Sequence, residues 1–251
     1  MHFSFLCKSF LDIIYVGTVH STHLSCVRHA LEGGKHVLAE KPLGVNAKEV
    51  AIMHKLSQDN GLFLMEGFWT RFLPCFGRLK EILDAGEIGR PMLIQGTLAT
   101  NDEQCGPARL FALDCAGGAL LDRGCYLLQL ANFVFKEEKV TKISASADIS
   151  DNGVDLSTAF TIHYSRKKIA QMYTSIVNDA GNSAIIYGSK GWLKINDVVA
   201  PETLSFSDGT VQHLPLFPLL QKDKTIPRSH ALSYQAEAVR QCIMDENGNY
   251  T

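Results

Sequence analysis

The first 71 residues of the chain alternate between two periods of apolar residues, and this alternation restricts the possible folds most. Three short apolar runs, at residues 13–17, 36–40 and 62–66, alternate with two segments whose apolar residues have helical spacing. The first helical segment ends at Gly33, and the second opens with Asn46 and Glu49 and stops at Gly61. Strands joined by single helices form βαβ units, so we predict a parallel sheet, half of a doubly wound fold, with strands buried on both faces.

After residue 86 the pattern changes to one rich in strands. Runs typical of strands lie at residues 92–98, 140–147, 158–164, 169–175, 184–187 and 192–195. The segments 117–135 and 229–244 have helical spacing, and residues 188–191 are typical of a hairpin turn. We therefore predict a second, α+β domain with an open, largely antiparallel sheet, and a boundary near residue 90. A length of 251 residues suits two domains.

Composition and cysteine spacing exclude several classes of protein. The 24 Lys and Arg residues against 26 Asp and Glu give a net charge of −2 without a basic block, so we expect no nucleic-acid partner. Seven scattered cysteines without a C-x-x-C pair indicate neither a disulfide framework nor a metal site, and favour a cytoplasmic location. No apolar stretch is long enough to span a membrane, and residues 1–11 do not have the pattern of a signal peptide.

One motif that such a fold often carries is absent. A dinucleotide-binding sheet begins with a strand, a G-x-G-x-x-G loop and a helix whose amino end receives the pyrophosphate. No G-x-G-x-x-G occurs in the 251 residues. We therefore expect that the opening βαβ unit is missing, either in a shortened product or because the boundaries of the gene are wrongly assigned.

Lys41 is the first candidate for chemistry. It lies in Glu40-Lys41-Pro42, at the end of the second predicted parallel strand, where side chains reach the crevice in which open α/β sheets bind ligands. The proline fixes where the strand ends. The alternative is a surface lysine before a loop.

Asp122 and Tyr126 are the second candidate pair, because residues four apart on the helical segment 117–135 share a face. A tyrosine becomes an effective acid or base when a nearby lysine stabilises its anion. At about 4 Å and an effective dielectric constant near 20, that attraction is roughly 4 kcal/mol, or about three pKa units before desolvation. Lys41 and Tyr126 are thus a candidate proton-transfer pair. The alternative is a core tyrosine whose hydroxyl is bonded by Asp122.

Two further loops adjoin the predicted crevice. Thr18, His20 and His23 follow the first strand, where they either contact a cofactor or pack at the start of a helix. Trp69 and Arg71 follow the third strand, as an interdomain packing group or a wall of the ligand site.

Four segments resemble, in family order, the Gfo/Idh/MocA family of NAD(P)-dependent oxidoreductases. They are residues 40–42, 68–74, 117–126 and 185–193. By that resemblance Lys41 matches the lysine beside the nicotinamide, Tyr126 the catalytic acid/base, and Asp122 the aspartate on the same helix. The resemblance runs from about Asp12 to the end of the chain.

The resemblance implies a partial Rossmann-like dinucleotide-binding domain at residues 1–90, and a substrate-binding and dimerisation domain at residues 91–251. It implies an NADP-dependent enzyme that transfers a hydride between the nicotinamide and a sugar such as D-xylose or a trans-dihydrodiol, in a homodimer joined through the open sheet. The residues implied at the cofactor are Thr18, His20, His23, Glu40, Lys41 and Arg71. Those implied at the substrate are Trp69, Asp122 and Tyr126. The alternative is a non-catalytic truncated product that dimerises without binding the dinucleotide.

Overall fold

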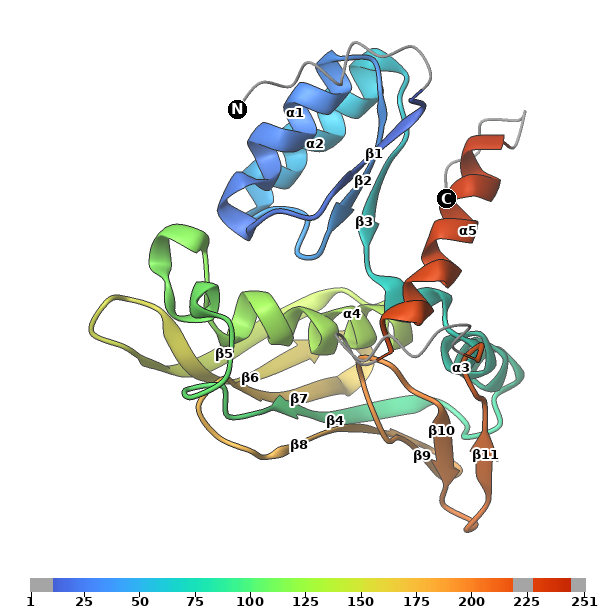
Figure 1. The fold of residues 1–251 in the computed structure, drawn as a ribbon. Coiled ribbons are helices and arrows are strands. Elements are labelled where there is room, and N and C mark those ends of the chain that lie inside the picture. Colours follow the sequence, from blue (N-terminus) through green and yellow to red (C-terminus); the bar gives the residue numbers. More distant parts are fainter. Residues whose placement is uncertain (1–10, 219–227, 245–251) are drawn as a thin grey trace.

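The computed structural model describes residues 11–218 and 228–244, so the expectations for residues 1–10 and for the end of the chain lie outside it. The described chain forms two sheets, one of three strands and one of eight (Figure 1). None of its helices is long and apolar enough to cross a membrane. Its six cysteines are free thiols.

The smaller sheet is parallel, as predicted, in the order β1 (Ile13–Val16), β2 (His36–Glu40), β3 (Leu64–Gly67). Helices α1 (His23–Glu32) and α2 (Ala47–Asn60) lie together on one side of it (Figure 1). Helix α5 (Leu232–Met244) contributes Val239 to a separate cluster with Leu38 and Phe63. Helices thus pack on both faces of this sheet over β2 and β3.

Local sequence signals set the limits of α2. The Asn46 side chain accepts hydrogen bonds from the backbone N–H groups of Lys48 and Glu49, each at 3.0 Å. The helix ends at Gly61, whose φ of 62° lies in the left-handed region that glycine adopts most easily. The prediction of strands buried on both faces was wrong for β1. Its Tyr15 side chain is 53% exposed, because β1 is the edge strand of the sheet that the structure describes.

The larger sheet is largely antiparallel, as predicted. Its order is β11-β10-β9-β8-β4-β7-β6-β5, and only β4 and β7 pair in parallel. Its strands are β4 (Pro91–Ala99), β5 (Val140–Ile149), β6 (Asp155–Tyr164), β7 (Lys168–Ser175), β8 (Gly181–Gly188), β9 (Trp192–Ile195), β10 (Thr203–Phe206) and β11 (Val211–His213). Residues 188–191 turn between the antiparallel pair β8 and β9, as predicted. The sequence prediction missed β10 and β11, which are short.

Two helices pack on this sheet and share its core. They are α3 (Pro74–Ala85) and α4 (Cys125–Val134), which bury Phe76, Leu79, Leu127 and Leu130 against the strands. Gly86 ends α3 with a φ of 65°. The division of the chain at residue 90 stays a prediction, and the core that α3 shares with the larger sheet lies on both sides of that division in sequence.

Candidate functional site

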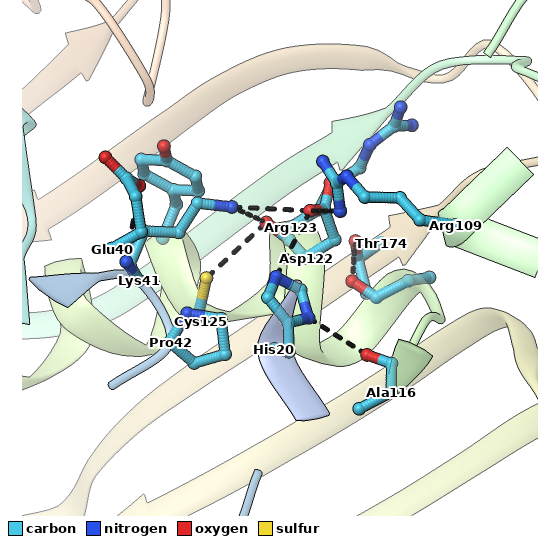
Figure 2. A network of polar contacts seen from close by, with 12 residues as sticks. His20, Glu40, Lys41, Pro42, Arg109, Ala116, Asp122, Arg123, Cys125 and Thr174 are labelled. Carbon is cyan, nitrogen blue, oxygen red and sulfur yellow. Dashed lines mark hydrogen bonds and ion pairs between the residues drawn. The ribbon is translucent and has the colours of Figure 1, made fainter. Parts of the chain in front are cut away.

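Lys41 follows the carboxyl end of β2 and reaches across to the larger sheet's helices. Its Nζ donates to the backbone oxygen of Asp122 at 2.6 Å and lies 3.5 Å from the carboxylate Oδ1 of the same residue (Figure 2). The Lys41 side chain is only 12% exposed. Two segments 81 residues apart in sequence therefore meet in a single enclosed polar contact.

A π-helical turn, Leu120–Gly124, places Asp122 just before α4 begins. The Asp155 carboxylate on β6 accepts from the Leu120 backbone N–H at 2.7 Å, which satisfies a donor at the start of this turn. Gly118 has a φ of 111°, and a Cβ there would overlap the Asp155 carboxylate. The turn is thus fixed by a glycine and a carboxylate. Such π turns are frequent at functional sites.

The Asp122 carboxylate is the centre of the polar cluster. Arg109 Nη1 lies 2.9 Å from its Oδ1, on the side opposite Lys41 (Figure 2), and His20 Nε2 lies 3.8 Å from the same oxygen. Burial raises the pKa of Asp122, but Lys41 and Arg109 outweigh burial and lower that pKa below its usual value. Asp122 is therefore ionised at neutral pH. The sequence prediction missed Arg109, which lies on an irregular loop in the 3₁₀ turn Ala108–Phe111.

Tyr126 lies on the first turn of α4, buried beside Lys41. Its ring is 6% exposed, with Lys41 Nζ 5.0 Å from the ring centroid and the Phe68 ring edge-on at 5.7 Å. The Tyr126 hydroxyl accepts a hydrogen bond from Trp69 Nε1 at 3.0 Å. In the described residues its partner is thus Trp69, and the alternative in which Asp122 bonds this hydroxyl is wrong.

Burial decides the protonation of this pair. Burial raises the pKa of Tyr126 to about 12, although Lys41 and the Trp69 hydrogen bond act to lower it. For Lys41, burial acts to lower the pKa, but the neighbouring Tyr126, Cys125 and Asp122 together raise it. At neutral pH Lys41 is charged and Tyr126 carries its proton. The expected lowering of the Tyr126 pKa is absent because desolvation exceeds the attraction of one ammonium group.

The two histidines bind backbone carbonyls at the same edge of the sheet. His20 Nδ1 lies 2.9 Å from the Ala116 oxygen, and burial lowers the pKa of His20. A carbonyl only accepts, so the neutral ring carries its proton on Nδ1 and leaves Nε2 toward Asp122. His23 bridges the carbonyls of Pro42 and Thr18, at 2.9 and 3.1 Å. His23 thus connects the loops that follow β1 and β2.

The remaining residues predicted at the cofactor are Glu40, Thr18 and Arg71. The Glu40 carboxylate accepts from the Tyr15 hydroxyl at 2.5 Å, and the Thr18 residue is exposed. Arg71 lies apart from the Asp122 cluster, with its guanidinium 5.7 Å from the Phe133 ring centroid. It lines a neighbouring cleft of about 950 Å³, together with Glu66 and Phe68. Residues 11–218 and 228–244 contain no group of three or more His, Cys, Asp or Glu side chains that could hold a metal ion.

Comparison with known proteins places this site in a family. Residues 5–68 match the description "Oxidoreductase family, NAD-binding Rossmann fold", and residues 76–194 match "GFO/IDH/MocA C-terminal domain". The trans-1,2-dihydrobenzene-1,2-diol dehydrogenase of Xenopus tropicalis is 32% identical over 234 residues, which cover 93% of this chain and 70% of that protein. This chain belongs to the Gfo/Idh/MocA family. The human protein of the same name is 33% identical over 233 residues, covering 93% of this chain and 69% of that protein.

Solved structures of oxidoreductases share the fold. KijD10, a 3-ketoreductase from Actinomadura kijaniata in complex with NADP and TDP-benzene, superposes with a TM-score of 0.85 at 23% identity, covering all of this chain and 75% of that one. The aldose-aldose oxidoreductase of Caulobacter crescentus superposes with a TM-score of 0.79 at 21% identity, covering 95% of this chain and 70% of that one. The predicted fold class and family are both confirmed. The protein is an oxidoreductase with an NAD-binding Rossmann domain.

Proposed function

We propose that this protein is an NADP-dependent oxidoreductase that transfers a hydride between the nicotinamide and a sugar such as D-xylose or a trans-dihydrodiol. The contact of Lys41 with both Asp122 and the Tyr126 ring carries the proposal. This contact joins the acid/base group of Tyr126, the Lys41 ammonium that favours the Tyr126 anion, and the Asp122 carboxylate that orients the ammonium. The names of the vertebrate relatives support the diol, and KijD10, with NADP bound, supports the choice of cofactor.

The residues at the edge of the parallel sheet suit the nicotinamide end of the cofactor. β1 and β2 are paired up to Val16 and Ala39, so the loops that follow them begin side by side. This edge is where open α/β sheets bind ligands. We propose that Thr18, His20, His23, Glu40 and Lys41 hold the nicotinamide end there, and that Arg71 contacts the cofactor from the neighbouring cleft. The bound cofactor supplies the hydride chemistry, and the protein supplies position and proton transfer.

Tyr126 is the proposed acid/base. When a substrate alcohol is oxidised, the Tyr126 oxygen takes the hydroxyl proton, and in the reverse direction the Tyr126 hydroxyl donates it. Lys41, 5.0 Å from the ring, and the N–H of Trp69 both stabilise the phenolate form. In this proposal Asp122 orients Lys41, and both Asp122 and Trp69 lie beside the substrate.

Substitution of Tyr126 tests this role. Tyr126→Phe keeps the buried ring and removes the proton, so we expect turnover to fall by about 10²–10⁴-fold with little change in NADPH affinity. Tyr164→Phe is the control, because Tyr164 is also buried but packs against Phe135 in the core of the larger sheet. Equal turnover in both variants would refute the assignment of Tyr126.

A second candidate is a non-catalytic form of the protein that dimerises without binding the dinucleotide. A dinucleotide-binding sheet commonly uses a G-x-G-x-x-G loop, which does not occur among the 251 residues. A loop of that kind gives the pyrophosphate several charge-assisted hydrogen bonds, of roughly 1.5–3 kcal/mol each. Titration with NADPH separates the two candidates, because only the first one binds.

We also propose that two copies associate through the larger sheet, in the cytoplasm. Every residue of the edge strand β5 is exposed, and the strand carries the large apolar side chains of Val140, Ile143 and Ile149. Exposed apolar side chains along an unpaired edge strand favour association. Analytical ultracentrifugation of an Ile143→Lys variant tests the dimer, which we expect to dissociate.

A further inference from the structure

Arg109 differs from the other members of the Asp122 cluster in its exposure. The side chains of Lys41, Asp122 and His20 are 12%, 12% and 6% exposed, whereas that of Arg109 is 39% exposed. Arg109 approaches Asp122 from the side opposite Lys41 (Figure 2). A molecule that enters the site from solvent therefore meets the guanidinium of Arg109 more readily than the other three groups.

The guanidinium also keeps hydrogen-bonding capacity. Arginine has five N–H donors in a planar fork. Arg109 Nη1 uses one of them on Asp122 Oδ1, and in the described part of the chain no partner is found for its Nε or Nη2. Such a fork matches the two oxygens of a carboxylate better than it matches single hydroxyl groups.

The charge around Arg109 is incompletely neutralised. Lys41 and Arg109 contact the same carboxylate oxygen, at 3.5 and 2.9 Å. One negative charge therefore faces two positive charges. Glu40 also acts on Lys41, but it is the last residue of β2, next to Lys41 in sequence, and is bonded to Tyr15. His20 is neutral and adds no charge at neutral pH. Positive charge thus remains on the side of Arg109.

We infer that the substrate this site prefers carries a carboxylate, which Arg109 binds, so that among sugars the protein favours a sugar acid over the corresponding neutral sugar. This inference rests on the proposed function. The substrate carbinol loses its hydrogen as a hydride to NADP⁺ and its hydroxyl proton to the phenolate form of Tyr126, and leaves as a carbonyl compound with its carboxylate unchanged. Arg109 holds the anionic end, and Tyr126 and Lys41 act at the carbinol.

The test compares D-glucuronate with D-glucose, which differ only in a carboxylate in place of a CH₂OH group. We expect the kcat/KM for NADP⁺ reduction to be at least about 10-fold higher with the acid, the effect of one charge-assisted hydrogen-bonded pair. Arg109→Gln should bring the ratio of the two kcat/KM values close to one, and Arg109→Lys should give an intermediate ratio. Arg240→Gln is the control, because Arg240 is exposed on α5 and pairs with Glu237.

The ratio separates recognition from a structural role. If Arg109 only orients Asp122, Arg109→Gln lowers both kcat/KM values equally, and the inference is wrong. If the wild-type protein reduces NADP⁺ with both sugars equally well, the inference is also wrong while the proposed function stands. If neither sugar, D-xylose nor a trans-dihydrodiol reduces NADP⁺, the proposed function itself fails.

Ionic strength gives a second measurement that does not depend on the variants folding. Binding of an anion to Arg109 weakens as salt screens the charges. Between 20 and 500 mM NaCl we expect the KM for D-glucuronate to rise several-fold more than the KM for D-glucose. Parallel changes in the two KM values would overturn the inference.

Discussion

Replacing Lys41 by methionine tests the proposal that Tyr126, a buried tyrosine with a raised pKa, serves as a base. The Lys41 ammonium lies 5.0 Å from the centroid of the Tyr126 ring. At an effective dielectric constant near 20, one charge at that distance stabilises the phenolate by about 3.3 kcal/mol, or about 2.4 pKa units. We expect Lys41→Met to raise the pKa of Tyr126 by that amount above its value of about 12.

The pH dependence of alcohol oxidation reports this shift. In the proposed mechanism oxidation requires the Tyr126 phenolate, and because the pKa of Tyr126 lies near 12, the phenolate fraction rises about tenfold per pH unit throughout the range of an assay. At a fixed pH between 8 and 10, an increase of about 2.4 pKa units should lower oxidation by about 250-fold. Lys41→Arg keeps the positive charge, so its rate of oxidation should fall far less.

The assay is kcat/KM for NADP⁺ reduction, measured with both variants from pH 7 to pH 10. Circular dichroism of each variant shows whether the fold is kept. A Lys41→Met protein that is folded and oxidises substrate within threefold of the wild type would refute the electrostatic role of Lys41. A loss as large in Lys41→Arg would refute it too, because the charge would then not be the cause.

Three further substitutions test the surroundings of the site. The pKa of Asp122 is lowered in the folded protein, so its ionised form stabilises the fold above about pH 4, and this stabilisation is lost as the pH falls through the lowered pKa. Asp122→Asn should therefore lower the free energy of unfolding in urea by about 3 kcal/mol at pH 7, and by progressively less as the pH falls below about 4. Trp69→Phe removes the donor to the Tyr126 oxygen and should lower oxidation at pH 9 by about 5- to 10-fold. Gly118→Ala should lower the melting temperature more than Gly209→Ala, because both strain a positive φ by about 1–3 kcal/mol but only Gly118 lacks room for a Cβ.

The sequence predicts the parallel sheet well because its signals are local. Asn46 caps α2 and Gly61 ends it within a few residues of the helix itself, and the β2 strand is found at residues 36–40 as predicted. The short strands β10 and β11 carry weaker patterns and were missed. The exposure of Tyr15 was missed too, because burial depends on where a strand lies in the sheet and not on its own residues.

The residues of the candidate site also differ in whether the sequence predicts them. Lys41, Asp122 and Tyr126 were found from their chemistry and from the family resemblance, and the structure brings them together. The Trp69 hydrogen bond to Tyr126 joins residues 57 apart, and Arg109 lies on an irregular loop, so neither has a local signal. The direction of the Tyr126 pKa shift depends on how deeply the ring is buried, which a sequence does not specify.

Titration of the purified protein with NADPH tests the central claim most directly. We expect the fluorescence of bound NADPH to saturate with a micromolar Kd and to fall when a carbonyl substrate is added, because NADPH is then oxidised. The Tyr126→Phe variant should bind NADPH equally well, but its fluorescence should fall far more slowly. Absence of saturation at millimolar NADPH would contradict the claim that this chain is an active oxidoreductase, and would favour the non-catalytic form.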